Sequence, residues 1–431
     1  MKALYDLIFV IGAIFFLPRY LFKGKFHPGF KARFGFFPKK VTFNRPIWIH
    51  AVSVGEVMAI RGLLEELRKS YPHKQFVIST VTPTGNKIAR NIALGHDCVT
   101  YLPLDLSFIV SGVIARVNPS LFILTETEFW PNLITRLYQK QIPIIAVNAR
   151  ISDASLRGYM SVKFILKHLL NKINLFCAQS KRDAERLARL GVAQDKIRVT
   201  GNMKFDIKDY GAYKKTCLPA GQAGRDDTDL KLRLGIKGRL LVAGSTHPGE
   251  EELVLAAYKK LLADFSDLRL LIAPRHPERA NEVRKAAKAS GFPSRLISQD
   301  GPGLPEDIFI LDSVGQLMPF YAIADIVFVG GSLVRKGGHN ILEPAVLGKP
   351  VLFGRHMFNF RDIADMFLEH EAAVCVSDAE DLRTKIKALL RDASKLQSLS
   401  QRAHVLLAAN KGATQKNLQL ISQICADIST V

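Results

Sequence analysis

The sequence predicts an α/β protein made of two doubly wound, Rossmann-like domains of similar size, with a hydrophobic anchor helix at the amino terminus. Two observations predict the domains. Short apolar runs alternate with helical patterns along most of the chain, as in parallel sheets covered on both faces. The alternation fails over residues 211–229 and then resumes. A third observation, an apolar run from residue 7 to 17, predicts the anchor.

In the first half, a helix is predicted from about residue 56, because Val57, Ile60, Leu63, Leu64 and Leu67 recur on one helical face. Strands are predicted where short apolar runs end in polar or glycine turns. These runs are residues 46–50, 76–81, 121–125, 142–148 and 175–179.

The second half repeats the pattern after a small, glycine-containing, polar stretch that is typical of a linker. Its predicted strands are residues 239–244, 268–273, 308–311, 326–330 and 350–353. The predicted division is an anchor at 1–22, domains at 23–207 and 237–410 joined by a linker at 208–236, and a C-terminal helix at 411–431. Ligands of such sheets bind beyond the carboxyl ends of the strands, so a cleft between the domains is the expected site.

Composition narrows the class of protein. The 431 residues are 48% hydrophobic and 23% charged, which excludes a disordered tail. The 60 Lys and Arg against 39 Asp and Glu give a net charge of +21, which points to an anionic partner. The five cysteines are scattered without a CxxC pair, which argues against a disulfide framework or zinc finger and favours a reducing compartment.

The amino terminus carries part of this charge. Residues 1–40 hold eight basic residues and one acidic residue, Asp6, and seven of the basic residues follow the apolar run. By the positive-inside tendency this predicts a chain held on the cytoplasmic face of a membrane, near anionic headgroups. A buried first helix with a solvated basic loop is the alternative, and whether residues 1–22 span the bilayer or lie on it stays open. No nucleic-acid-binding motif accompanies the basic residues, so nucleic acid is not an expected partner.

The loop after the first strand holds the first candidate residues. Ser53 and Gly55 suit a tight turn near a ligand, and Glu56 opens the next helix. Glu56 could simply complement the helix dipole, as acidic residues in first turns often do. The dipole also lowers the pKa of a carboxyl group, so a useful base there would need burial or a second nearby carboxylate.

Glu126 could supply that second carboxylate, since it follows the strand at 121–125 and is expected at the same sheet edge as Glu56. For Glu128 we favour a different role, capping of the next helix together with Trp130. Arg150 and Lys204 follow later strands and could each offset negative charge in a cleft.

The second domain has glycine-rich loops suited to phosphate, because helix N-terminal N–H groups can reach an anion there. They lie at residues 244–250, 274–279, 330–332 (ending at Ser332) and 337–344. Glu343 is expected to accept hydrogen bonds from ribose hydroxyls. His247, His276 and His339 lack metal-ligand spacing. Neither GxGxxG after the first strand nor a Walker A loop is present, so hydride transfer and ATP hydrolysis lose support.

Seven motifs together resemble the 3-deoxy-D-manno-octulosonic acid (Kdo) transferase family of lipopolysaccharide synthesis. They are HAVSVGE, TETEFWPN, NARIS, GNMKFD, STHPGEE, PRHPER and GGSLVRKGGHNILEP. The resemblance implies a GT-B fold, with acceptor binding in the domain at 23–207 and CMP-sugar binding in the domain at 237–410, and it implies no cofactor and no catalytic metal. It implies transfer of Kdo from CMP-Kdo to the tetraacyl, 4′-phosphorylated lipid A precursor (lipid IVA), by an enzyme anchored at the cytoplasmic face of the inner membrane.

The resemblance also implies residue roles. Glu56 corresponds to the general base, and Glu126 and Lys204 to residues that stabilise the transition state. The implied CMP contacts are Pro274, Arg275, Val314, Gly315, Gln316, Asn340, Ile341, Leu342 and Glu343. Gln316 stands where the family has Glu, which leaves its role open, and residues 217–225 resemble an addition to the linker.

These implications predict an inverting displacement in which Glu56 deprotonates the acceptor hydroxyl and CMP leaves. Three alternatives remain. Another GT-B glycosyltransferase or a sugar-nucleotide epimerase would share the second-domain loops. A non-catalytic, membrane-docked lipid-binding protein would use the basic face alone, without binding CMP.

Overall fold

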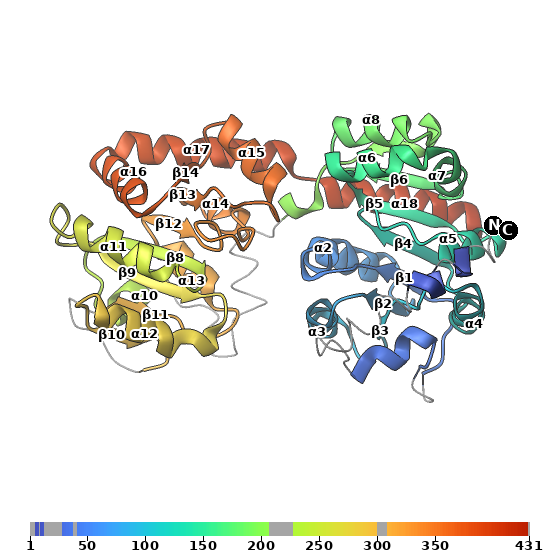
Figure 1. The fold of residues 1–431 in the computed structure, drawn as a ribbon, viewed down its shortest axis with the longest axis horizontal. Helices are drawn as coiled ribbons and strands as arrows, with labels where there is room; N and C mark the ends of the chain where they lie inside the picture. The colour runs from blue at the N-terminus through green and yellow to red at the C-terminus, as the bar shows by residue number, and fades with distance from the viewer. Residues whose placement is uncertain are drawn as a thin grey trace. The chain divides into compact units, whose positions relative to one another are not determined.

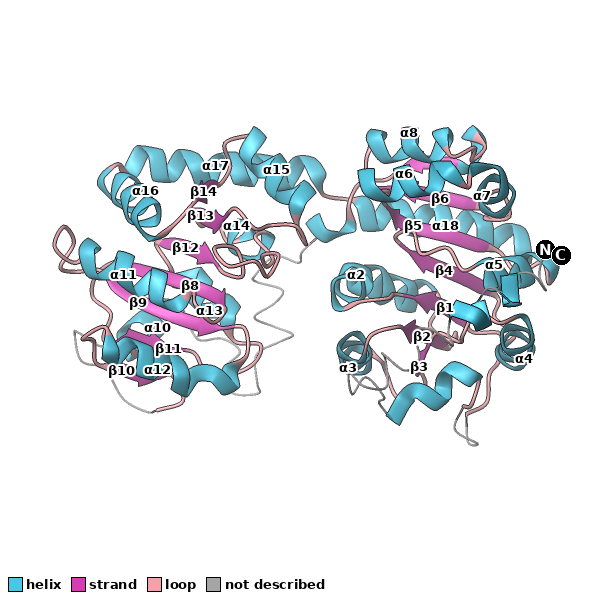
Figure 2. Ribbon diagram, in the orientation of Figure 1, coloured by secondary structure: helices cyan, strands magenta, loops and turns pink. Residues whose placement is uncertain are grey.

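The computed structural model describes residues 5–7, 9–12, 28–37, 41–206, 227–299 and 308–429. Its contacts divide the chain into two compact units. Unit 1 is Met1–Asp206 with Asn410–Val431, and unit 2 is Ile207–Ala409. Each unit is a seven-stranded parallel sheet with helices on both faces (Figures 1 and 2). The predicted fold class of two parallel α/β units is confirmed.

Unit 1 has the strand order β3-β2-β1-β4-β5-β6-β7. The strands are β1 (Ile47–His50), β2 (Phe76–Thr80), β3 (Cys98–Tyr101), β4 (Leu121–Thr125), β5 (Ile144–Ala149), β6 (Leu175–Ala178) and β7 (Ile197–Val199). The helices are α2 (Val54–Ser70), α3 (Pro83–Ile92), α4 (Ser107–Val117), α5 (Pro131–Gln139), α6 (Asp153–Ser161), α7 (Lys163–Leu170), α8 (Lys181–Arg189) and α18 (Ala413–Ser429). The 3-10 turns are η1 (Pro28–Phe34), η2 (Gln194–Lys196) and η3 (Met203–Phe205).

Unit 2 has the strand order β10-β11-β9-β8-β12-β13-β14. The strands are β8 (Leu240–Thr246), β9 (Arg269–Pro274), β10 (Ser294–Leu296), β11 (Ile308–Ile310), β12 (Ile326–Val329), β13 (Val351–Gly354) and β14 (Val374–Val376). The helices are α10 (Asp227–Arg233), α11 (Glu251–Leu261), α12 (Ala280–Ala289), α13 (Leu317–Ile323), α14 (Leu342–Val346), α15 (Arg361–Glu369), α16 (Ala379–Arg391) and α17 (Ala393–Asn410), with the turn η4 (Pro277–Arg279).

Both sheets reverse their strand order at one point, and the loops there are the usual ligand sites of open parallel sheets. In unit 1 the reversal lies between β1 and β4, which pair in parallel. In unit 2 it lies between β8 and β12. The loops that follow these four strands carry most of the candidate residues, so the topology gathers residues that are far apart in the sequence.

The C-terminal helix α18 belongs to unit 1 and is not the separate segment predicted at 411–431. Leu418 and Ile421 pack in the same apolar cluster as Val57 and Ile60 of α2. Asp206, the last residue of the GNMKFD motif, accepts hydrogen bonds from the backbone N–H groups of Gly412 and Thr414 at the start of this helix. The carboxylate therefore caps α18, which places a negative charge at the positive end of the helix.

Most of the predicted anchor lies outside the described residues. Residues 5–7 and 9–12 are helical, and Asp6 accepts hydrogen bonds from the N–H of Ser107 (3.1 Å) and from the side chain of Asn132 (2.7 Å). Within the described ranges, no helix combines the length and apolarity that crossing a bilayer requires. The predicted linker also lies partly outside them, and its later part forms α10, where Lys231 pairs with Asp325 at 3.1 Å.

Candidate active site

Glu56 lies in the first turn of α2, directly after the β1 loop, and its residue is only 8% exposed. Its carboxylate accepts hydrogen bonds from the backbone N–H of Val52 (2.8 Å) and the hydroxyl of Ser53 (3.1 Å). Burial, followed by the negative charge of Glu126, raises the pKa of this carboxyl to about 7, against the opposing effect of the two hydrogen bonds. Burial and a second carboxylate, the two conditions for a useful base, are thus both present.

The raised pKa of Glu56 has a consequence for stability. The folded protein holds the proton up to a pKa of about 7, against 4.5 for an ordinary glutamate, so stability falls as the pH rises between these values. Glu56→Gln removes this cost. The free energy of unfolding of the variant relative to wild type should therefore grow by about 1–3 kcal/mol between acidic and basic pH. Urea unfolding at both pH values measures it, and a pH-independent difference would contradict the assignment.

Glu126 follows the last residue of β4 in a left-handed conformation, with φ of 59°. A non-glycine residue in this region carries backbone strain of about 1–2 kcal/mol, which is typical of functional sites. Its backbone N–H still donates to the carbonyl of Val147 at 2.9 Å, so the left-handed residue leaves the hydrogen bonding between β4 and β5 intact. Its carboxylate pairs with the ammonium of Lys204 at 3.2 Å, with both side chains about one-fifth exposed.

Asn148 connects this ion pair to the sheet. Its backbone is left-handed, with φ of 53°, and its side chain is fully buried. The side-chain oxygen accepts a hydrogen bond from the N–H of Met203 at 3.0 Å, which fixes the turn η3 that carries Lys204. Asn148 is the first residue of the NARIS motif, and the motif alone indicates no role for it. The tolerance of asparagine for left-handed backbone is the local signal that could have suggested one.

Glu128 does not cap α5, so that prediction is wrong. The first N–H groups of this helix, at Asn132 and Leu133, donate to the buried carboxylate of Asp105 instead. Desolvation and the charge of Glu126 raise the pKa of Glu128, although its side chain stays exposed. Glu128 therefore belongs electrostatically to the Glu56–Glu126 cluster.

The remaining candidates of unit 1 surround this cluster. Ser53 is the N-cap residue of α2 and donates its hydroxyl to Glu56, so it orients the carboxylate. Gly55 lies inside α2, where a Cβ atom would come no closer than 3.9 Å to another residue, so the fold does not require glycine there. Arg150 follows β5, and its carbonyl accepts a hydrogen bond from Thr127.

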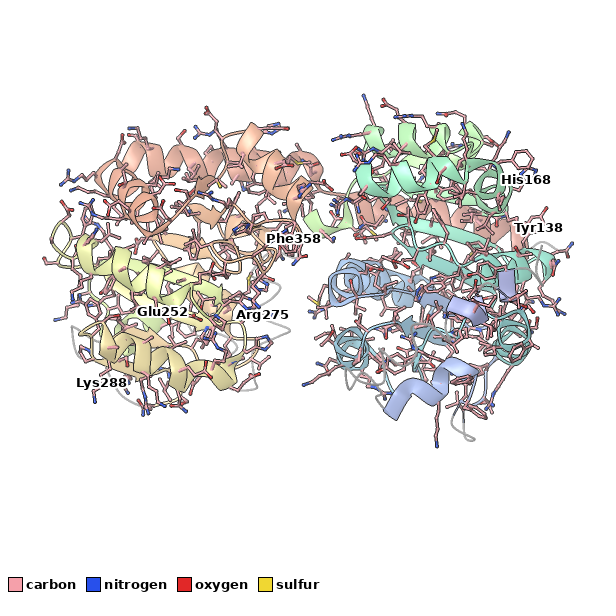
Figure 3. The ribbon with its side chains drawn as sticks, viewed as in Figure 1. Tyr138, His168, Glu252, Arg275, Lys288 and Phe358 are labelled. Carbon is pink, nitrogen blue, oxygen red and sulfur yellow. The ribbon has the colours of Figure 1, made fainter. Side chains whose placement is uncertain are left out.

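In unit 2, three of the predicted CMP contacts gather around Glu343 at the start of α14. Asn340 donates to the carboxylate of Glu343 at 3.2 Å and accepts from the N–H of Leu342 at 3.2 Å. Burial raises the pKa of Glu343, while Asn340 and the positive charge of Arg275 lower it. Arg275 lies in the loop after β9 with an exposed side chain, labelled in Figure 3. Ile341 and Leu342 are fully buried, so only their backbone can contact a ligand.

The other predicted CMP contacts occupy two further loops. Pro274 is buried at the end of β9. Val314 is 85% exposed and precedes Gly315, whose φ of 80° favours glycine. Gln316 is the N-cap residue of α13, and its side-chain oxygen accepts a hydrogen bond from Ser313 at 3.1 Å.

Ser332 is placed inside the fold, with no exposed surface. Its hydroxyl donates to the carbonyl of Val329 and accepts from the N–H of Gly354 at 2.7 Å. Its backbone N–H is also occupied, because the fully buried Glu250 accepts from Gly331 (2.7 Å), Ser332 (3.0 Å) and Leu333 (2.8 Å). The 330–332 loop, predicted to hold phosphate, thus uses these donors to bind a carboxylate of its own chain. Ser332 therefore holds the loop in place.

Removing Glu250 should destabilise unit 2 strongly. Glu250→Ala leaves the buried N–H groups of residues 331–333 without an acceptor, which should lower the free energy of unfolding by about 3–5 kcal/mol. Glu252→Ala, at an exposed position on α11, is the matched control and should change it by less than about 0.5 kcal/mol. Urea unfolding of both variants measures this, and equal effects would refute the role.

His247 and His339 form a pair that the sequence did not reveal. Their Nε2 atoms lie 2.9 Å apart, so one ring must donate and the other accept. Burial and nearby positive groups lower their pKa values, to about 4 and about 3, so both rings are neutral. Across the described residues, no group of three or more His, Cys, Asp or Glu side chains is arranged to hold a metal ion.

Comparisons with known proteins identify the family. The family model described as 3-deoxy-D-manno-octulosonic-acid transferase (kdotransferase) matches residues 28–207. The 3-deoxy-D-manno-octulosonic acid transferase of Haemophilus influenzae is 38% identical over 381 residues, covering 87% of this chain and 86% of that protein. The protein of the same name from Chlamydia trachomatis serovar A is 30% identical over 432 residues, covering 98% of this chain and 97% of its own length.

Solved structures of low identity show the fold alone. A putative UDP-N-acetylglucosamine 2-epimerase from Listeria monocytogenes matches with a TM-score of 0.60 at 15% identity, covering 90% of this chain and 98% of that one. A glycosyltransferase from Rickettsia africae matches with a TM-score of 0.57 at 14% identity, covering 89% and 99%. The fold is therefore GT-B-like, and the motif resemblance is confirmed by the sequence relatives. The chain belongs to the 3-deoxy-D-manno-octulosonic acid transferase family and is a glycosyltransferase.

Proposed function

We propose that this enzyme transfers Kdo from CMP-Kdo to a hydroxyl of the lipid A precursor, with inversion at the anomeric carbon and Glu56 as general base. The observation that carries the proposal is the buried Glu56 carboxyl. Its pKa is raised to about 7, in part by the charge of Glu126, and Glu126 in turn forms an ion pair with Lys204. A base with a pKa near the working pH combines a large ionised fraction with a strong pull on the proton.

The proposed reaction is a single displacement at the anomeric carbon. The acceptor hydroxyl oxygen attacks the anomeric carbon of Kdo while its proton passes to the ionised Glu56 carboxylate. The bond from the anomeric carbon to the phosphate oxygen breaks, and CMP leaves with the electron pair as a phosphate monoester. Ser53 and the N–H of Val52 hold the Glu56 carboxylate in place for this transfer.

The Glu126–Lys204 pair sets the charge next to the base. The carboxylate of Glu126 keeps the pKa of Glu56 high. The ammonium of Lys204, held 3.2 Å from Glu126, supplies positive charge where the transition state carries negative groups. The strained backbone of Glu126 supports this role, because strain of this kind is retained where it positions a reacting group.

The donor nucleotide is assigned to unit 2. Arg275 offers a guanidinium to the phosphate, and Asn340 and Glu343 offer polar groups to the ribose. The exposed Val314 offers an apolar contact for the nucleobase of CMP. These groups supply positive charge and hydrogen bonds to the leaving phosphate, so the proposed step needs no cofactor or metal.

The acceptor and the membrane complete the proposal. The basic residues that follow the amino-terminal apolar run suit an anionic inner-membrane surface on its cytoplasmic face. Asp6, bound to Ser107 and Asn132 at the starts of α4 and α5, would tie the anchor to unit 1.

The test is transfer from freshly generated CMP-Kdo to the lipid A precursor in detergent, read by mass spectrometry of the lipid. An acceptor mass increase of one or more Kdo units is the expected result. No mass increase, with the protein still binding the lipid, would favour a non-catalytic lipid-binding protein and overturn the proposal. A mass increase with another sugar nucleotide alone would assign a different donor.

A further inference from the structure

The turn η3, which carries Lys204, is bound to the C-terminal helix α18. Its C-cap residue is Asp206, whose carboxylate accepts hydrogen bonds from the N–H of Gly412 at 2.6 Å and from the N–H of Thr414. Gly412 lies 206 residues further along the sequence, beyond the whole of unit 2. Lys204 is therefore two residues from a contact that joins its turn to a distant part of the chain.

Apolar packing between η3 and the start of α18 supports this contact. Met203 and Ala413 are both buried in the same apolar cluster. Gly201, just before the turn, lies so close to α18 that a Cβ atom there would stand 3.3 Å from the Cβ of Ala413. The Asp206 carboxylate therefore acts at a close-packed junction, where a shift of η3 would also disturb α18.

The same helix packs against α2, which carries Glu56 in its first turn. Leu418 and Ile421 of α18 share an apolar cluster with the buried face of α2. At Gly62 of α2, a Cβ atom would lie 3.8 Å from the hydroxyl oxygen of Thr414. The helix α18 thus contacts both elements of unit 1 that carry proposed reacting groups, α2 and η3.

The position of the Lys204 ammonium depends on the backbone of this turn. The ammonium pairs with Glu126 at 3.2 Å, and the N–H of Lys204 accepts its partner within the turn by donating to Asn202 at 3.0 Å. On the side of the sheet, Asn148 accepts from the N–H of Met203 at 3.0 Å. A lysine side chain is long and flexible, so its ammonium stays in one place only if the backbone below it is fixed. The contacts with Asn148 and with α18 fix that backbone from two directions.

We propose that Asp206 is a positioning residue for the transfer reaction, because its bond to the start of α18 holds Lys204 next to Glu126. The proposal rests on the proposed function, which gives Lys204 the task of stabilising the transition state. A cap that served α18 alone would add to the stability of the protein and leave the rate unchanged. Asp206 differs from such a cap because it ends the turn that carries a reacting group. The C-terminal helix would then support the chemistry of unit 1 as well as its fold.

The first arm of the test compares Asp206→Ala with the loss of a matched cap in unit 2. Asp378 accepts from the N–H groups of Glu380 (3.0 Å) and Asp381 (2.9 Å) at the start of α16, so Asp378→Ala removes the same kind of contact. Both variants should unfold at lower urea concentrations than wild type. Asp206→Ala alone should lower kcat, by about 10- to 100-fold, because small displacements of a reacting group are costly. The KM for CMP-Kdo should not change.

Asp206→Asn provides the conservative rescue. Asparagine keeps one side-chain oxygen that can accept from α18, so this variant should recover most of the lost kcat. Equal kcat values for Asp206→Ala and Asp378→Ala, or an Asp206→Asn enzyme as slow as Asp206→Ala, would overturn the proposal.

The second arm shows whether Asp206 acts through Lys204. In a Lys204→Met background, Asp206→Ala should lower kcat by less than about 2-fold, because the group that it positions is already gone. A further loss as large as that in the wild-type background would overturn the proposal, since Asp206 would then act on another group.

The third arm needs no transfer activity. The full chain is treated briefly with acetic anhydride, and the acetylation of each lysine is read by peptide mass spectrometry. Lys204, whose side chain is 19% exposed and paired with Glu126, should react several-fold faster in Asp206→Ala than in wild type, and Asp378→Ala should match wild type. Equal reaction of Lys204 in all three proteins would refute the positioning role. Failure of wild type to transfer Kdo, with the labelling result intact, would instead refute the proposed function.

Discussion

Replacing Glu56 with glutamine is expected to lower kcat by about 10²–10⁴-fold while the protein stays folded. Glutamine keeps the size of the side chain and can still accept the hydrogen bond from Ser53, but it cannot take a proton from the acceptor hydroxyl. The KM for CMP-Kdo should change little, because the nucleotide contacts are assigned to unit 2. Mass-spectrometric transfer assays at saturating donor and acceptor measure the effect.

The matched control for this variant is Glu66→Gln on the same helix. Glu66 pairs with Lys69 on the exposed face of α2, so its replacement should leave kcat unchanged. A Glu56→Gln enzyme that turns over at near wild-type rate would remove Glu56 from the reaction. The stability comparison at two pH values shows independently whether the variant is folded.

Replacing Lys204 with methionine is expected to lower kcat by about 10²–10³-fold, the cost of losing one charged group that stabilises a transition state. The methionine side chain fills a similar volume, so the main change is the loss of positive charge next to Glu126. Without that charge, the carboxylate of Glu126 acts more strongly on Glu56, and the pKa of Glu56 should rise further.

Two readouts separate this electrostatic role from a structural one. The pH dependence of kcat should move to higher pH in Lys204→Met, which a mere packing defect would not produce. Lys204→Arg keeps the charge and should recover part of the activity. An unmoved pH profile, or a Lys204→Arg enzyme as poor as Lys204→Met, would argue against the electrostatic role.

The parallel strands at the centre of each sheet were predictable because they are buried on both faces. The core strands β1 and β4, for example, read as continuous apolar runs, and every one of their residues is buried. The strands that escaped prediction are the short edge strands of the two sheets, β3 and β7 in unit 1 and β10 and β14 in unit 2. In β7, Arg198 and Val199 are exposed, so the local sequence carries no apolar run to detect.

The candidate base could be located from the sequence, but its chemical state could not. The pKa of Glu56 depends on burial by the folded unit and on Glu126, which lies 70 residues further along the chain. The contact between His247 and His339 likewise joins residues 92 positions apart. The prediction that the 330–332 loop holds phosphate also missed a contact between distant residues. Glu250 accepts the hydrogen bonds from the N–H groups that a phosphate would need.

The most direct test of Glu56 as a base tuned by Glu126 is the pH dependence of kcat/KM for wild type and Glu126→Gln. Wild-type kcat/KM should rise with pH through an apparent pKa of about 7, the value for the Glu56 carboxyl. In Glu126→Gln this rise should occur at lower pH, because the negative charge next to Glu56 is gone. A rise caused by ionisation of a substrate would occur at the same pH in both enzymes. A rise in activity centred near pH 4.5, or a rise at the same pH in both enzymes, would contradict the claim that Glu56 is the base tuned by Glu126.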